Sequence, residues 1–298
     1  MKKFLSLTLC LVLTVCTLTA CGKSEEGTKD DNAEKGNNAD TAKLTAKVID
    51  IDLTSEEYAF GVDKSQPELL ETVNKFIAEI KSNGTFDAIC NNYFGDGTPV
   101  PVTSATLDPN KEQLVVATNA AFEPFEFMKG DSYCGIDMEI AAKLAEYLGQ
   151  ELVIQNMDFD AVCLSVGQQK CDIAMAGLTI KEERLEYVNF TDSYYSASQK
   201  LIVPSDNTEF DACKDAAAVE AILNAKDAAT KIGVQNGTTG QIYCEGDEEW
   251  GFAGFKATAV GYKNGSLAVQ DLLNGNINYV IIDSAPAACI TEAINKMR

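Results

Sequence analysis

The sequence contains no histidine, so the commonest general base and the commonest metal ligand of proteins are both missing. Ten cysteines are present, but no two are spaced as Cys-X-X-Cys, and we therefore expect no zinc site and no other metal or cofactor. Basic residues are scarce: 24 Lys and Arg stand against 45 Asp and Glu. This acidic balance argues against nucleic acid or an anionic membrane surface as a partner.

Long apolar runs are also missing, except for one at the N-terminus. Two lysines precede an apolar stretch over residues 4–18, which ends in Leu18-Thr19-Ala20-Cys21. The stretch is too short for a stable membrane span, and small residues before a cysteine are typical of a lipoprotein cleavage site. We predict a signal peptide over residues 1–20 and a lipid on Cys21, which would hold the protein on the extracytoplasmic face of the cell membrane. The alternative is a signal anchor that stays uncut.

The next segment has no large apolar residue between positions 22 and 43. Such a stretch cannot bury enough surface to offset the entropy of ordering it, so we predict a disordered tether over residues 21–45.

Seven cysteines remain after the lipidation site, and most lie within apolar patterns. We interpret them as small buried hydrophobic residues, with a Cys213–Cys244 disulfide as the alternative. The seven are Cys90, Cys134, Cys163, Cys171, Cys213, Cys244 and Cys289.

Short apolar runs alternate with helical stripes in two successive series, over residues 114–177 and 199–296. The first series includes expected helices at 136–149 and 159–169. Each series predicts a mostly parallel sheet flanked by helices. Two such units in one chain predict an α/β fold of two lobes with a cleft between them, and ligands of open α/β sheets bind at the carboxyl ends of the strands.

The segment before these series is smaller. It predicts strands at 47–52 and 56–63, a helix at 67–84 and a short helix at 85–93. These elements cannot make a core of their own, so we expect them to pack on the two lobes. Residues 96–113, with three prolines, are predicted to be a connector.

Several segments, taken in order, resemble one family. They are VVATNAAFEPFEF (115–127), GIDMEIAAKLAEYLG (135–149), MDFDAV (157–162), AGLTIKEERLEYVNFTDSYY (176–195) and GVQNGTTG (233–240). The chain is similar to the polar amino-acid-binding proteins of ABC importers, which have the type 2 periplasmic-binding fold. The resemblance implies a monomeric, extracytoplasmic solute-binding protein that captures a small L-amino acid by hinge closure and presents it to the permease subunits.

The resemblance also implies boundaries for the lobes. Lobe one is expected at 56–194, including the connector, and lobe two at 46–55 with 195–298. Crossover strands near 53–60 and 192–200 would form the hinge.

The order of the segments departs from the family. The stretch that resembles residues 56–95 lies at the C-terminus in the family, so this chain is interpreted as circularly permuted. A gene-fusion or sequencing artefact is the alternative, but residues 43–55 continue naturally from Met297-Arg298.

An amino acid carries a carboxylate and an ammonium group, and each needs a partner when it is buried. Arg184 is the carboxylate candidate, because a guanidinium grips a carboxylate with two hydrogen bonds. The N–H groups of Thr179 and Thr239 would add donors, the latter at the start of a helix. The alternatives are a surface arginine in KEER and an ordinary glycine-rich turn in NGTTG.

Asp283 is the ammonium candidate, because it ends the buried strand NYVII, where its charge needs a partner. The Thr179 hydroxyl and the Gly177 carbonyl would complete this half of the site. The alternative role of Asp283 is to cap the helix that follows it.

The resemblance implies further roles. Phe122 and Phe159 would be aromatic walls, while Asn119 and Gln235 would face the ligand's side chain. Because a binder of lysine or arginine usually has an acid at the position of Asn119, a polar neutral amino acid such as glutamine or cystine is expected.

Two rival functions remain. A dehydratase on the same fold would need an acid in the cleft, for which Glu123 or Glu126 are candidates. A sensor subunit that hands its ligand to a signalling receptor would have the same binding site. We expect no enzymatic activity.

Overall fold

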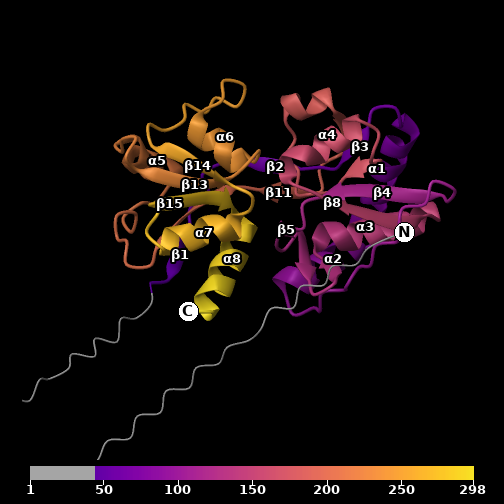
Figure 1. Ribbon diagram of the computed structural model, residues 1–298, viewed down its shortest axis with the longest axis horizontal. Helices are drawn as coiled ribbons and strands as arrows, with labels where there is room; N and C mark the ends of the chain where they lie inside the picture. The colour runs from indigo at the N-terminus through magenta and orange to yellow at the C-terminus, as the bar shows by residue number, and fades with distance from the viewer. Residues whose placement is uncertain (1–43) are drawn as a thin grey trace, which may run out of the picture. The chain divides into compact units, whose positions relative to one another are not determined.

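Two five-stranded sheets organise residues 44–298, the part of the chain that the computed structural model describes (Figure 1). In spatial order, the first sheet contains β10 (Val188–Phe190), β3 (Gly61–Asp63), β9 (Ile173–Ala174), β4 (Gln113–Thr118) and β8 (Glu151–Asn156). The second contains β1 (Ala46–Ile49), β12 (Gln199–Pro204), β15 (Tyr279–Asp283), β13 (Lys231–Gln235) and β14 (Thr258–Tyr262). The expected signal peptide and Cys21 lie outside the described residues.

The two-lobed α/β fold is confirmed, but both sheets are mixed where mostly parallel sheets were predicted. In the first, β4 is parallel to β8 and β9, whereas β3 is antiparallel to β9 and β10. In the second, β13 is parallel to β14 and β15, whereas β12 is antiparallel to β1 and β15. The cause is that β3 and β12 enter their sheets directly from the crossing segments, without a helix that would reverse their direction.

Two short strands connect the lobes. These are β2 (Glu56–Tyr58) and β11 (Tyr195–Ala197), which pair antiparallel in a sheet of their own, with Tyr58 opposite Tyr195. β2 leads into β3 of the first sheet, and β11 leads into β12 of the second. Figure 1 shows β2 and β11 between the two lobes. The chain therefore crosses between the lobes at a narrow pair of strands that can act as a hinge.

Helices flank each sheet. The first has α1 (Pro67–Ser82), α2 (Thr85–Phe94), α3 (Ile136–Leu148) and α4 (Val162–Gly167), and the second has α5 (Ala216–Asn224), α6 (Thr239–Glu245), α7 (Gly265–Leu273) and α8 (Ser284–Lys296). Two 3₁₀ turns, η1 (Phe159–Ala161) and η2 (Glu182–Glu186), precede α4 and β10. The predicted helix at 159–169 is therefore split into a 3₁₀ turn and a shorter helix.

The helix α1 illustrates how the sequence specifies these elements. Proline stands at its first position, where its missing N–H costs nothing, and the stripe of Val73, Phe76, Ile77 and Ile80 is buried. Gly84 follows its end with a φ of 80°, a conformation that glycine adopts without strain. This stripe joins the same core cluster as Leu114 of β4 and Ile140 of α3, so the N-terminal segment packs on a later part of the chain, as predicted.

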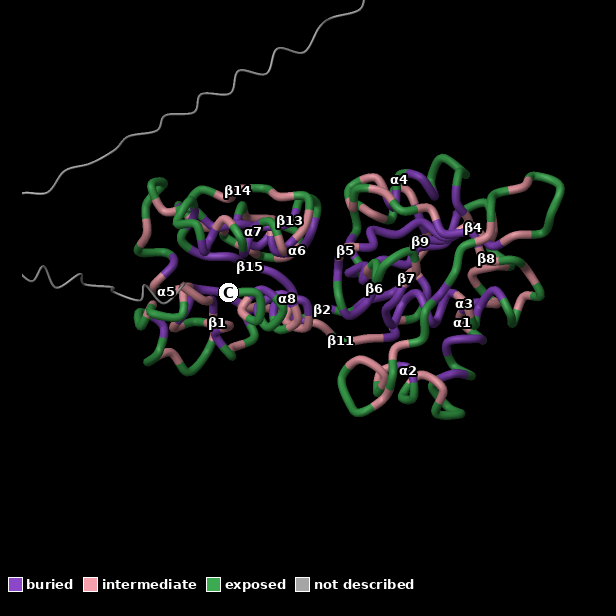
Figure 2. Tube along the Cα trace, turned by 60° about the horizontal axis from the view of Figure 1, so that its bottom comes forward, coloured by how far each residue is buried: buried purple, intermediate pink, exposed green. Residues whose placement is uncertain are grey.

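The buried residues concentrate on the central strands of the two sheets (Figure 2). Every residue of β15 is buried, and this strand ends in Asp283. A further, three-stranded sheet of β5 (Ala121–Phe122), β6 (Glu126–Lys129) and β7 (Ser132–Cys134) was not predicted. All seven cysteines of the described residues are free thiols, and four of them are buried, so the Cys213–Cys244 disulfide is not formed.

The two ends of the described chain lie together. The Asn295 amide bonds both the N–H and the carbonyl of Ala46, at 2.9 and 2.8 Å. The Arg298 guanidinium donates to the Leu44 carbonyl at 3.0 Å. Helix α8 thus ends against β1, the first strand. Within residues 44–298, no helix is both long and apolar enough to cross a membrane.

Candidate functional site

A small cavity lies where the two lobes face each other. Its lining comes from β5, η1, the loop after β9, η2, the start of α6 and the end of β15. The lining residues are Phe122, Phe159, Gly177, Thr179, Arg184, Thr238, Thr239 and Asp283. Seven of the nine residues that the sequence singled out therefore surround one space, and Thr238 was not among them. The cavity measures about 10 Å³, room for about one water molecule, so an amino acid can enter only if the lobes move apart.

Arg184 bridges the two lobes. One guanidinium nitrogen donates to the Thr179 carbonyl at 2.6 Å, and the other donates to the Gly237 carbonyl of the opposite lobe at 3.1 Å. The guanidinium also lies 5.3 Å from the centre of the Phe159 ring. Both of its hydrogen-bond acceptors are neutral carbonyl groups. Its positive charge is thus free to pair with an anion in the cavity, which argues against the surface-arginine alternative.

Asp283 lies buried at the opposite side of the cavity. It occupies the N-cap position of α8, but its side chain makes no capping hydrogen bond, so the capping alternative does not account for it. Its Oδ1 instead accepts a 2.5 Å hydrogen bond from the Tyr58 hydroxyl. Burial, followed by the negative charge of Glu56, raises the pKa of Asp283 to about 7, and the Tyr58 hydrogen bond opposes this rise. A cation beside Asp283 would relieve this cost.

Thr179 connects the buried carboxylate of Glu56 to the opposite lobe. Its hydroxyl donates to Oε2 of Glu56 at 2.9 Å and accepts from the Thr239 hydroxyl of the other lobe at 3.2 Å. Glu56 is 4% exposed, and its Oε1 accepts from Gln199 Nε2 and from the Thr54 hydroxyl. The sequence did not single out Glu56, because its partners Thr179 and Gln199 are 123 and 143 positions away in the chain.

Gly177 turns the backbone at the floor of the cavity. Its φ is +53°, and a Cβ at this position would approach the Phe122 ring to 3.0 Å, so the close contact favours glycine. Its N–H donates to Oδ2 of the buried Asp137, whose Oδ1 accepts from the Tyr194 hydroxyl. Burial raises the pKa of Asp137 to about 7, while these two hydrogen bonds lower it.

Asn119 and Gln235 do not line the cavity, and they contact each other instead. Gln235 Nε2 donates to Asn119 Oδ1 at 3.2 Å across the two lobes, and Asn119 Nδ2 donates to the Met157 carbonyl at 2.6 Å. Gln235 is 1% exposed, and its Oε1 has no hydrogen-bond partner among the described residues. The pair therefore leaves an unused acceptor between the lobes.

An ion pair across the lobes was not foreseen from the sequence. Lys181, which is 4% exposed, donates to Oδ2 of Asp247 at 3.0 Å and to Glu183 at 2.8 Å. Burial lowers the pKa of Lys181, but the hydrogen bonds to these two acids outweigh it, so the net pKa lies above its ordinary value. Lys181 and Asp247 are 66 positions apart in the sequence, and the closed arrangement of the lobes brings them into contact.

The two acids considered for a dehydratase do not line the cavity. Glu126 is fully buried, and neither of its carboxylate oxygens has a hydrogen-bond partner among the described residues. Burial, followed by the charges of Asp137 and Asp283, raises the pKa of Glu126 well above its ordinary value. Glu123 lines two separate surface hollows.

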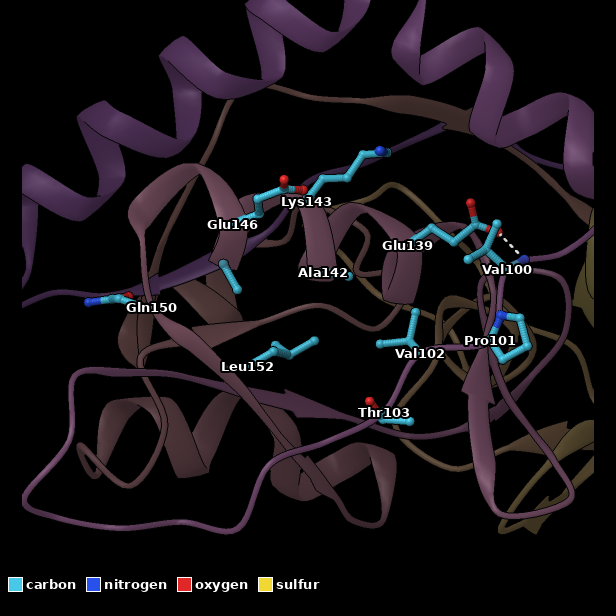
Figure 3. Close-up of a pocket in the computed structure, with 11 residues that line it drawn as sticks. Val100, Pro101, Val102, Thr103, Glu139, Ala142, Lys143, Glu146, Gln150 and Leu152 are labelled. Carbon is cyan, nitrogen blue, oxygen red and sulfur yellow. Dashed lines mark hydrogen bonds between the residues drawn. The ribbon is translucent and has the colours of Figure 1, made fainter.

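A larger hollow of about 430 Å³ lies between α3 and the connector (Figure 3). Glu139 anchors the connector there, because its Oε1 accepts from the Val100 N–H at 2.8 Å and from the Tyr93 hydroxyl at 2.7 Å. The carboxylate is thus committed to the fold, and none of the residues that the sequence singled out for the ligand faces this hollow.

Two lobes, a hinge of two strands and an interlobe cavity with one guanidinium and one carboxylate define a two-lobed binding protein. The family model for bacterial extracellular solute-binding proteins, family 3, matches residues 114–282. The chain therefore belongs to this family.

Individual relatives agree with this assignment. The chain is 33% identical to the arginine-binding extracellular protein ArtP of Bacillus subtilis (strain 168), over 34% of this chain and 39% of that one. It is 30% identical to ABC transporter arginine-binding protein 1 of Escherichia coli (strain K12), over 58% of this chain and 64% of that one. The matches thus span less than two thirds of the length of these curated relatives.

A solved structure is similar as well. The ancestral amino acid-binding protein AncCDT-1, described as a precursor of cyclohexadienyl dehydratase, aligns with a TM-score of 0.52 at 30% identity. The alignment covers 61% of this chain and 75% of that one. This likeness supports the two-lobed fold.

Proposed function

We propose that this protein captures a small polar L-amino acid between its lobes and delivers it to the permease subunits of an ABC importer. The observation that carries the proposal is the cavity itself, with the Arg184 guanidinium and the Asp283 carboxylate in its lining. These two groups complement the carboxylate and the ammonium of a zwitterion. The names of the arginine-binding relatives support an amino acid as the class of ligand.

Closure of the hinge would couple binding to recognition. In the present arrangement, Arg184, Thr179 and Lys181 each contact a residue of the opposite lobe. An amino acid inserted between the lobes would replace the first two of these contacts with its own. Because it would touch both lobes at once, it would favour the closed form, which the permease would then recognise.

The ligand's side chain would extend toward Asn119 and Gln235. Both are amides, and the unused Gln235 Oε1 calls for a hydrogen-bond donor, such as the amide of glutamine. The walls of Phe122 and Phe159 would hold the aliphatic part of the ligand.

Binding without chemistry is part of the proposal. Neither Glu126 nor Glu123 lines the interlobe cavity, and Glu123 lines a separate surface hollow. Neither acid is therefore placed to donate a proton to a molecule bound in the cavity. Turnover of a cyclic amino-acid precursor by the purified protein would contradict this part of the proposal.

Membrane attachment through a lipid on Cys21 and action as a monomer complete the proposal, together with the circular permutation. Three observations support the permutation. The family match begins at residue 114, β3 from the N-terminal segment pairs with β9 and β10, and α8 ends against β1. Residues 96–113 would then join what are the two ends of the chain in the family.

Calorimetric titration of the purified protein with all twenty amino acids and cystine tests the function. We expect at least one to bind in the micromolar range or tighter. Binding of none of them would contradict the proposal.

A further inference from the structure

A second buried carboxylate lies next to the ammonium side of the cavity. Glu56 begins the crossover strand β2, and its three hydrogen-bond donors come from both sides of the hinge: Thr179 from the first lobe, Gln199 from β12, and Thr54. None of these donors is charged. A 4% exposed carboxylate held only by neutral groups is costly unless a cation approaches it.

Glu56 determines the direction of the Thr179 hydroxyl. A threonine hydroxyl has one proton, and Thr179 donates it to Oε2 of Glu56 at 2.9 Å. The remaining lone pairs of Thr179 accept, and at present they accept from the Thr239 hydroxyl. Because Thr179 lines the cavity, it presents a hydrogen-bond acceptor to whatever enters. An ammonium group has only donors and fits this arrangement.

Glu56 and Tyr58 are two residues apart on β2, so their side chains lie on the same face of the strand. Tyr58 donates to Asp283, and the charge of Glu56 is, after burial, the main cause that raises the pKa of Asp283 to about 7. The hinge strand β2 therefore carries Glu56 itself and, through Tyr58, a hydrogen-bond donor to Asp283.

We infer that Glu56 is a positioning residue of the amine subsite, which fixes Thr179 as an acceptor and adds a second negative charge beside Asp283. The subsite would in this way select an α-ammonium group over an α-hydroxyl group at the same position. The inference rests on the proposed function and goes beyond it, because it assigns amine selection to a residue outside the cavity lining.

The experiment compares Glu56→Gln with Glu57→Gln. Glu57 is the next residue of the same strand and is exposed, so its variant controls for the loss of one acid from the hinge. The first measurement needs no ligand: the carboxyl carbon of Asp283 is titrated by NMR in each purified protein. Removing the like charge of Glu56 should lower the pKa of Asp283 by about half a unit or more, and the Glu57 variant should leave it unchanged.

The second measurement titrates each protein with L-glutamine and L-arginine and with the α-hydroxy acid analogue of each. The wild type should prefer the amine by about 100-fold, and the Glu56→Gln variant should reduce this preference by about tenfold, because it removes one of the two negative charges near the ammonium. If Glu56→Gln does not fold, Thr179→Val removes the same acceptor and should reduce the preference similarly.

The outcomes separate the two proposals. An unchanged pKa of Asp283, or an unchanged amine preference, in Glu56→Gln would overturn the inference about Glu56. An equal effect of Glu57→Gln would overturn it too. If the wild type binds none of the four compounds or any other amino acid, the proposed function fails, and the ligand-free titration then decides on Glu56 alone.

Discussion

The Tyr58 hydroxyl donates a 2.5 Å hydrogen bond to Oδ1 of Asp283, although the two residues are 225 positions apart in the chain. This contact ties the crossover strand β2 to the carboxyl end of β15. The acid proposed to bind the ligand's ammonium is therefore hydrogen-bonded to the hinge. A substitution at Tyr58 should change the pKa of Asp283, and a substitution at Asp283 should change the contacts of Tyr58.

Removal of this hydrogen bond should destabilise the protein in a pH-dependent way. In Tyr58→Phe, the ionised Asp283 loses its donor, and we expect the free energy of unfolding to fall by about 1–3 kcal/mol at pH 8. The loss should be smaller at pH 5.5, where Asp283 is protonated. Urea unfolding at the two pH values measures it, and Tyr147→Phe, at a 46% exposed tyrosine, serves as control. An equal loss at both pH values would contradict the role of the charge.

Neutralisation of Asp283 should stabilise the protein without ligand while abolishing binding. Its pKa is about 7 in the folded protein against 3.8 ordinarily, so the folded state holds the extra proton between these values and wild-type stability falls as pH rises through that window. Asp283→Asn should therefore gain roughly 2–4 kcal/mol over the wild type at pH 8 and little at pH 4.

Part of the pH dependence should survive in Asp283→Asn, because Asp137 also has a pKa of about 7. Three titratable groups interact with Asp283. The charge of Glu56 raises its pKa and the hydrogen bond from Tyr58 lowers it, while the charge of Asp283 raises the pKa of Glu126. Thermal unfolding between pH 4 and 9 measures the slope. A variant less stable than the wild type at pH 8 would show that Asp283 has a structural partner that the fold does not reveal.

Loss of the guanidinium should abolish binding with little effect on the fold. We expect Arg184→Ala and Arg184→Lys to weaken amino-acid binding by about 100-fold or more, since a bidentate charged pair is lost. The control is Arg298→Ala, because Arg298 is the only other arginine in the chain and lies at the opposite end of the second lobe's last helix from Asp283. Unchanged affinity in the Arg184 variants would contradict the carboxylate assignment.

The two interlobe ion pairs should differ in effect. Lys181 is buried beside Asp247, so Asp247→Asn removes one of the two acids that pair with the Lys181 ammonium. We expect this change to destabilise the closed form and to make ligand release faster. Lys263 and Asp158 are both exposed at 3.3 Å, and Asp158→Asn should change release little. Stopped-flow measurements of ligand dissociation give the release rate of each variant. Equal rates in the two variants would argue against a role of the Lys181–Asp247 pair in holding the lobes closed.

The order of the segments can be tested by rebuilding it. A chain of residues 113–298 followed directly by 43–95 would restore the order of the family. Because α8 ends against β1, we expect this chain to fold and to keep its ligand affinity within about threefold, a change of less than 1 kcal/mol. Failure to fold would contradict the permutation.

The strands and helices could be predicted largely from the sequence, because their apolar patterns are local. The predicted helix at 136–149, for example, corresponds to α3 (Ile136–Leu148). The β5 to β7 strands escaped prediction because they are two to four residues long and lack a clear alternation. The antiparallel orientation of β3 and β12 within their sheets was not predicted either, since it depends on how the chain crosses the hinge and not on the residues of either strand.

The candidate site was predictable to a similar extent. Asp283 stood out because it ends a fully apolar strand, and Arg184 because of the motif around it. Glu56 and the Lys181–Asp247 pair could not be found in this way, because they depend on contacts between lobes that no local pattern encodes.

The most direct test of the account combines two single variants with modified ligands. The best-binding amino acid, its α-hydroxy analogue and its α-carboxamide are titrated by calorimetry against the wild type, Asp283→Asn and Arg184→Ala. The account predicts that Asp283→Asn costs affinity only for compounds that carry the ammonium, and that Arg184→Ala costs affinity only for those that carry the carboxylate. Losses that do not depend on which group the ligand carries would contradict the two half-sites.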